Sequence, residues 1–406
     1  MDTEQPHERV LIRDLAKQVA AIAQSEANES IKKRWRDVNA LRKPDRAPVW
    51  CRPVGAWSEI LPDDSLQCHT PWLRQLELTL RRTLIKHDIG DDNPVPDYFC
   101  VGTVLDCDPP NIWGVDIEHA QSGADGGAWA YEPPLQRAED FAKLTVPTFT
   151  YNKAETERRL NRMDDLLGDI LPVRQKCGIP VSPPICGPAA DLRGLTQLMM
   201  DCIAEPELLH RLMAHIRDVY LSGIDQLEAL GLLTPNNDGP MTCSDWVGPA
   251  ASGPLSAANL WYMTNSQEFD QISPEMWKEF CLDYELPIIE RFGLSSYGCC
   301  ENLTHKMDDV LRIPNLRIFV CSAWTDLEKT IDHVGEDYVI MWRQKATDVV
   351  FAEDETTLRR ELEDGTEKLQ GSYYQIVLRE LQTLDGHPDR LHVWTRHAIE
   401  AAEKFA

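Results

Sequence analysis

The chain has 406 residues, of which 43% are hydrophobic, so it is long enough to bury a large core. Its 66 acidic and 41 basic residues give a net charge of -25, which repels the phosphate backbone of a nucleic acid and an anionic membrane surface alike. The first residues lack the basic-then-apolar order of a secretory signal and no apolar run could span a bilayer, so we expect a cytoplasmic protein without nucleic-acid or membrane partners.

The first 40 residues are charged, and their apolar side chains recur at near-helical spacing, which predicts an N-terminal helical arm over residues 1–40. From residue 41 to 406, short apolar or β-branched segments alternate with longer helical patterns, as repeated βα units around a parallel sheet do. The expected strands are 47–51, 98–105, 179–187, 231–237, 294–300, 316–322, 337–343 and 374–380. Eight strands predict an α/β fold in which residues 41–406 form one (β/α)8 TIM barrel.

Other segments predict what surrounds the strands. Residues 91–147 are rich in Pro, Gly, Asp and Trp and have little helical periodicity, so we expect an insertion over one barrel face. Ser273 followed by Pro274 and Glu275 predicts the start of a helix, since serine can cap it and proline fits its first turn. Pro206, flanked by two glutamates, predicts another helix start, and the acidic run 353–367 predicts a solvated helix face.

The densest group of potential ligands follows the fifth predicted strand. In an extended strand alternate side chains share a face, so Tyr297, Cys299 and Glu301 would point one way and Cys300 the other. The thiolate of Cys299 and the carboxylate of Glu301 could hold two corners of a zinc site, with a third ligand from elsewhere and one corner open for substrate. The alternative is a buried cysteine pair beside a carboxylate that a helix N-terminus satisfies, since cytosolic cysteines stay reduced.

Polar residues also follow the fourth predicted strand. The amide of Asn237 and the carboxylate of Asp238 could orient a polar substrate, but a turn that satisfies its own backbone explains them equally well. Walker loops, strand-following GxGxxG segments and GxSxG elbows are missing from the sequence, so neither nucleotide binding nor serine-hydrolase chemistry is expected.

Arginines and tryptophans stand at the ends of the first and seventh predicted strands. Arg52 and Arg343 could clamp a substrate carboxylate, although surface or ion-paired arginines are common. Trp50 and Trp342 could supply flat apolar walls for a substrate, and packing in the core is at least as good an explanation.

The run Ala-Pro-Val-Trp-Cys-Arg-Pro-Val-Gly-Ala-Trp at 47–57 resembles the PVWxMRQAGRY motif of the uroporphyrinogen decarboxylase superfamily. The strand ends at 236–238 and 297–302 and the Ser273-Pro274 helix follow the course of the same superfamily, which has a TIM-barrel fold. Arg52 aligns with the first arginine of the motif, but Ala56 stands in place of the second, and the late NxGHG-like histidine is missing. Uroporphyrinogen itself is therefore not the expected substrate.

The superfamily also contains zinc-dependent methyltransferases that exchange methyl groups with corrinoid proteins. Tyr297-x-Cys299 stands where these enzymes have His-x-Cys, and no cysteine follows Cys321. The resemblance therefore implies a substituted Zn²⁺ ligand set of Cys299, Glu301 and either Cys321 or a residue near Cys243.

Three functions follow from these patterns. The leading hypothesis is a methyltransferase that moves a methyl group from a small compound, such as a methoxylated aromatic, to a corrinoid on a separate protein, with Glu301, Asp238 and Tyr297 as catalytic candidates. The acceptor must be separate because the DxHxxG-like stretch that begins at Asp385 has Arg390 in place of its glycine. The alternatives are a decarboxylase or lyase for a small carboxylate and a barrel that serves as a non-catalytic binding subunit.

Overall fold

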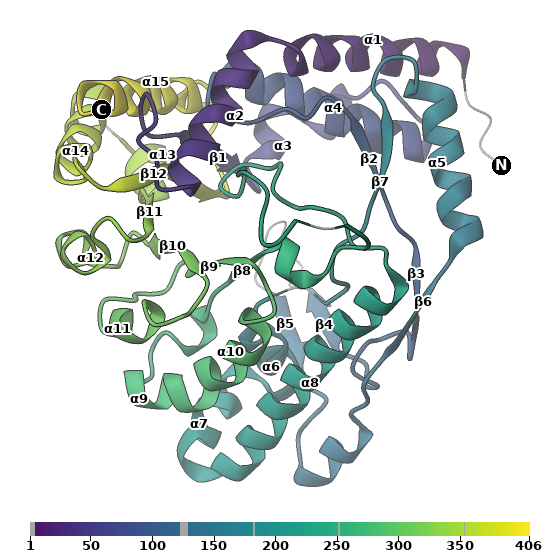
Figure 1. Cartoon of the computed structure of the whole chain (residues 1–406), viewed down its shortest axis with the longest axis vertical. Helices are drawn as coiled ribbons and strands as arrows, with labels where there is room; N and C mark the ends of the chain where they lie inside the picture. The colour runs from purple at the N-terminus through teal and green to yellow at the C-terminus, as the bar shows by residue number, and fades with distance from the viewer. Residues whose placement is uncertain (1–4, 122–128, 182, 251, 353) are drawn as a thin grey trace.

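The fold is built on a curled parallel sheet, seen in the computed structural model in Figure 1, which describes residues 5–121, 129–181, 183–250, 252–352 and 354–406. The six strands of the sheet lie in the order β1-β12-β11-β10-β9-β8. Their bounds are β1 Val49–Pro53, β8 Trp261–Thr264, β9 Leu294–Tyr297, β10 Leu316–Cys321, β11 Val339–Arg343 and β12 Tyr373–Leu381. The chain therefore has the α/β architecture that the sequence predicts.

Shorter ladders accompany this sheet. They are the parallel pair β2 (Phe99–Gly102) and β7 (Val173–Lys176), and the antiparallel pairs β3 (Leu105–Asp108) with β6 (Thr148–Tyr151) and β4 (Glu118–Gln121) with β5 (Trp129–Glu132). Residues 231–237, all of which the structure describes, contain no strand, but Thr234 N–H donates to the Cys177 carbonyl at 3.0 Å. The described chain thus has a six-stranded open sheet, and closure into an eight-stranded barrel stays a prediction.

The predicted strands from 294 onward and the first one, at 47–51, are confirmed within a few residues. The prediction of a strand at 179–187 is wrong. The strand in this part of the chain is β7, which ends before residue 179, and helix α6 begins at Cys186. The prolines between β7 and α6 cannot continue a strand ladder because they lack a backbone N–H. Strand β8, which is four residues long, was not among the predicted strands.

Helices pack around the sheet and at one end of it. The segment predicted to be helical contains α1 (Pro6–Ala23) and α2 (Glu26–Asn39). The remaining helices are α3 Trp57–Ile60, α4 Pro71–Ile89, α5 Lys153–Leu167, α6 Cys186–Arg193, α7 Leu195–Ala204, α8 Pro206–Leu230, α9 Pro274–Trp277, α10 Asp283–Ile289, α11 Met307–Val310, α12 Leu327–Val334, α13 Ala346–Val350, α14 Glu355–Lys368 and α15 Arg390–Lys404. As predicted, the Ser273 hydroxyl caps α9 by accepting the N–H of Met276. None of the helices in the described ranges is both long and apolar enough to cross a membrane.

The two faces of the sheet pack against different partners. On β11, Val339 and Met341 lie in an inner cluster that also contains Trp35 of α2, whereas Ile340 lies in the larger cluster shared with the outer helices. Because side chains alternate along a strand, Arg343 at the end of β11 belongs to the inner face. The inner face is therefore apolar within the sheet and becomes charged at the carboxyl ends of the strands.

Candidate metal and thiol site

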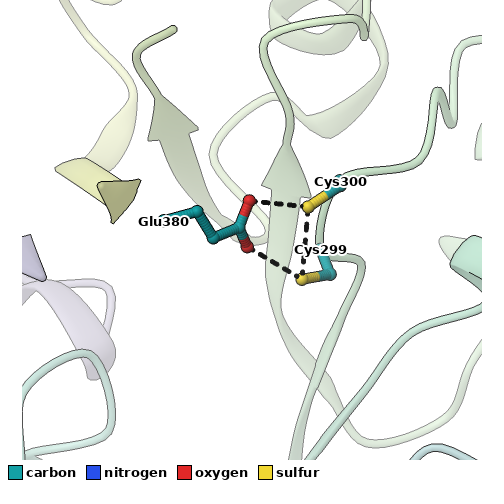
Figure 2. A group of neighbouring side chains, drawn as sticks. All are labelled: Cys299, Cys300 and Glu380. Atoms are coloured by element: carbon teal, nitrogen blue, oxygen red, sulfur yellow. Dashed lines mark hydrogen bonds between the residues drawn. The ribbon is translucent and has the colours of Figure 1, made fainter. Parts of the chain in front are cut away.

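Three side chains with metal-binding atoms meet at the carboxyl ends of β9 and β12, as Figure 2 shows. The sulfur atoms of Cys299 and Cys300 are 3.8 Å apart, and the Cys300 thiol donates to the Glu380 carboxylate at 2.7 Å. In the part of the chain that the structure describes, no other three His, Cys, Asp or Glu side chains bring their ligand atoms within 4.8 Å of one another. Although β10 and β11 separate β9 from β12 in the sheet, its curl brings the two ends together.

The cysteines lie side by side because β9 ends before them. Its last residue is Tyr297, and Gly298 turns the chain with a φ of +114°, a conformation that residues other than glycine rarely adopt. A side chain at this position would also lie 2.9 Å from the side chains of Leu303 and Val320. The expectation that Cys299 and Cys300 point to opposite faces is therefore wrong, since it assumed that the strand continues.

Glu380 reaches the thiols because of an irregularity in β12. The register between β1 and β12 shifts after Cys51 pairs with Leu378, so that Pro53 pairs with Leu381, and Glu380 adopts a φ of +66°. Such a bulge redirects a side chain that regular alternation would send to the outer face. Glu380 stands at the end of the last predicted strand, where reactive groups are expected, but the ligand set expected from the sequence does not include it.

Arg343 ties the cluster together. Its guanidinium pairs with the Glu380 carboxylate at 2.7 Å, donates to the Cys299 carbonyl and lies 3.5 Å from the Cys299 sulfur. The side chain is only 6% exposed, so this positive charge acts in a poorly solvated environment. Arg343 therefore holds the site residues in place, and its charge is already matched by Glu380.

These contacts determine where the protons lie. The hydrogen bond with Cys300 and the charges of Arg343 and Arg379 outweigh burial and lower the pKa of Cys299 to about 7. The same hydrogen bond, burial and the neighbouring Glu380 carboxylate raise the pKa of Cys300. Burial of Glu380 opposes its ionisation, but the bond from Cys300 and the charge of Arg343 prevail and lower its pKa. The arrangement is thus a thiolate, a thiol and a carboxylate.

Glu301 supports the loop that carries the thiols. Its carboxylate accepts the backbone N–H groups of Ser266 and Cys299, both at 2.8 Å, and burial raises its pKa. Cys321 points to the outer helices, where its sulfur lies 3.6 Å from the Thr330 hydroxyl. The structure therefore does not bring Cys299, Glu301 and Cys321 together as ligands, because strand alternation turns Cys321 outward and the backbone occupies Glu301.

The other two catalytic candidates lie apart from the thiols. Tyr297 is fully buried on the outer face of β9, where its ring meets Trp277 edge to face at 6.1 Å. The Asp238 carboxylate accepts hydrogen bonds from the Tyr98 hydroxyl and the Lys176 ammonium. Burial alone would raise the pKa of Asp238, but these two hydrogen bonds outweigh burial, so the pKa is lowered. Neither residue is placed to react with a group held by Cys299 and Cys300.

Two of the predicted substrate contacts have structural roles instead. The Asn237 amide donates to the carbonyls of Ser244 and Asp245, both at 3.0 Å, and so closes its own loop. Trp342 packs against α14, where a side chain added at Gly365 would lie 2.2 Å from its ring. Both residues therefore face away from the cluster.

The remaining predicted contacts lie at the end of β1. Trp50 is buried, and its indole N–H donates to Asn93 at 3.1 Å. Arg52, two residues further along the strand, is exposed. Both residues line the same cavity, whereas their predicted partners Arg343 and Trp342 do not line it.

Comparisons with known proteins show the fold of the chain. No protein-family model matches the sequence, and no curated protein matches it. Among solved structures, the chain is similar to a methyltransferase from Methanosarcina mazei, with a TM-score of 0.55 and 11% sequence identity. The match covers 92% of this chain and 98% of that one, so the two proteins share their fold over nearly their whole lengths.

Proposed function

We propose that the protein is a methyltransferase whose reactive centre is the cluster of Cys299, Cys300 and Glu380. The observation that carries this proposal is the convergence of two thiols and a carboxylate at the carboxyl edge of the parallel sheet, where α/β enzymes place their chemistry. The shared fold with a methyltransferase supports it. The proposed reaction moves a methyl group from a small compound, such as a methoxylated aromatic, to a corrinoid carried by a separate protein.

The donor atoms of the cluster fit a zinc ion. Zinc in proteins binds thiolate sulfur and carboxylate oxygen, and a catalytic site uses three protein ligands with one position open. Cys299, Cys300 and Glu380 would be those ligands, and a bound Zn²⁺ would act as a Lewis acid toward the donor atom that carries the methyl group. Because Cys300 holds a proton that a zinc ligand must lose, Cys300 would release that proton to solvent when zinc binds.

The remaining residues of the site act by positioning. Arg343 holds the Glu380 carboxylate and the Cys299 carbonyl in place. Glu301 holds the loop by accepting the backbone N–H of Cys299. In the transfer, the carbon–oxygen bond of the donor breaks and its electron pair stays on oxygen, which takes up a proton from solvent. Cobalt(I) on the partner protein supplies the pair for the new carbon–cobalt bond and becomes cobalt(III).

The test is the absorbance change from cobalt(I) to methyl-cobalt(III) when candidate donors are added to this protein and a reduced corrinoid protein. We expect the change with at least one methoxyaromatic, methylamine, methylthiol or methanol. It should be lost in Cys300→Ala and kept in Cys107→Ala, which removes another partly exposed cysteine far from the cluster. The methyltransferase proposal fails if none of these donors produces the absorbance change with corrinoid proteins that are encoded by neighbouring genes.

The decarboxylase or lyase alternative is less well supported. It uses Arg52 and Arg343 to bind a substrate carboxylate, but the charge of Arg343 is already matched by Glu380. A substrate carboxylate would have to displace a carboxylate that the chain holds in place.

A further inference from the structure

A cavity of about 340 Å³ lies at the carboxyl end of β1, and its lining is cationic. Arg52 contributes from the strand, and Arg82 and Lys86 contribute from α4. Among the described residues that line this cavity there is neither an aspartate nor a glutamate. In a chain with a net charge of -25, a cavity with three cations and no acid is not expected from composition alone.

Only one of these cations has a counter-ion. Lys86 pairs with the buried Asp91. Arg52 and Arg82 make no hydrogen bond or ion pair to any residue that the structure describes. The Nε of Arg82 is buried without an acceptor, and its guanidinium lies 5.0 Å from the centre of the Trp57 ring. A buried donor without an acceptor costs free energy, so this geometry is suited to a ligand that supplies one.

A third arginine extends the positive charge toward the thiols. Arg379 of β12 lies beside β1, because Cys51 pairs with Leu378 in the register of the two strands. Its Nε is also buried without an acceptor, and its charge acts on both Arg52 and Cys299. The cationic cavity and the thiol cluster are therefore neighbouring parts of one edge of the sheet.

We propose that this cavity binds the oxyanion of a small molecule, a carboxylate or a phosphate ester, between Arg52 and Arg82. A guanidinium presents paired N–H donors that match both groups, and the lack of an internal carboxylate leaves these donors available. Trp57 backs the Arg82 guanidinium and keeps it in place. Anion binding at this cavity does not depend on methyl transfer. The further assumption that the bound anion is also the methyl donor rests on the proposed function.

The experiment is calorimetric titration of the full chain at low salt with three probes, 4-methoxybenzoate, phenyl phosphate and the neutral methoxybenzene. We expect one or both anions to bind and methoxybenzene to bind at least about tenfold more weakly. Binding of 4-methoxybenzoate alone identifies a carboxylate site, binding of phenyl phosphate alone identifies a phosphate site, and binding of both identifies a general oxyanion site.

Substitutions locate the binding. Arg82→Gln and Arg52→Gln should each weaken anion binding about tenfold, and Arg52 is exposed, so its replacement does not disturb the core. Arg312→Gln removes the same charge from an exposed ion pair with Asp309 and should change nothing. The proposal is overturned if neither anion binds at millimolar concentration, if methoxybenzene binds as tightly as the anions, or if both arginine variants bind like the wild type. Anion binding by a protein that transfers no methyl group would reject the proposed function and keep this site.

Discussion

In the cluster of Cys299, Cys300 and Glu380, the position of the thiol proton decides which atom is reactive. With the Cys300 thiol bonded to Glu380, Cys299 carries the negative charge beside Arg343. Because its pKa is lowered to about 7, the thiolate forms as the pH rises through that value and not near the usual 8.5. Neither cysteine would have this property alone, which is why sequence spacing could not identify it.

In protein treated with a chelator, alkylation of Cys299 by iodoacetamide should therefore have a midpoint near pH 7. Arg343→Met should raise the midpoint toward the ordinary cysteine value, because it removes the positive charge that favours the thiolate. Peptide mass spectrometry across pH 5 to 10 measures both, with the partly exposed Cys107 as an internal reference. A midpoint for Cys299 at or above that of Cys107 would refute the charge distribution.

Glu285 on α10 offers a second pH test. It is fully buried, the Thr264 hydroxyl donates to one of its oxygens, the other oxygen lacks a partner among the described residues, and burial raises its pKa to about 8. The folded state then holds this proton more tightly than the unfolded state, whose pKa is about 4.3, so stability falls as the pH rises from about 4.3 to about 8.

Glu285→Gln should abolish this loss of stability with rising pH. We expect the variant to be more stable than the wild type at pH 9, by on the order of 5 kcal/mol, with the difference fading toward pH 4. Urea unfolding at several pH values measures it, and the exposed Glu290→Gln should follow the wild type throughout. Identical pH profiles for wild type and Glu285→Gln would show that Glu285 is ionised in the folded protein at little cost.

At the scale of elements, the site depends on where two strands stop being regular. Apolar patterns predicted β10 to β12 well, because buried parallel strands need largely apolar segments. The turn at Gly298 and the bulge at Glu380 each involve a single residue with positive φ, and no periodicity signals them. The turn reverses the predicted direction of Cys300 and the bulge turns Glu380 toward the thiols, which is why the ligand set derived from the sequence differs from the cluster in the structure.

Gly298→Ala tests this dependence. A side chain at a φ of +114° and 2.9 Å from Val320 should destabilise the protein by on the order of 1–3 kcal/mol and separate the two thiols. Gly371→Ala is the control, since φ there is +92° but the space around it is open. Thermal unfolding and zinc content should both fall in Gly298→Ala, whereas Gly371→Ala should lose some stability and keep its zinc. Normal zinc content in Gly298→Ala would show that this turn does not position the cysteines.

At the scale of the whole molecule, composition and alternation predicted an α/β protein with an N-terminal helical arm, but not how the arm packs. The apolar residues of α1 form a cluster with α4 and α5, whereas Trp35 and Val38 of α2 pack in the inner cluster of the sheet. The sequence could also place reactive groups at the carboxyl ends of strands, a rule that selected Cys299, Cys300, Arg52 and Arg343. It could not tell which arginine has a counter-ion, because Glu380 reaches Arg343 on the neighbouring strand only where the bulge in β12 redirects its side chain.

The proposed metal site is tested most directly by the zinc content of anaerobically purified protein. Elemental analysis determines it for the wild type, Cys300→Ala and Cys321→Ala. With Cys299, Cys300 and Glu380 as ligands, we expect about one zinc ion per chain in the wild type and in Cys321→Ala, and little in Cys300→Ala. A wild type without zinc after growth with added zinc, or zinc that is kept in Cys300→Ala and lost from Cys321→Ala, would contradict the metal site proposed for this cluster.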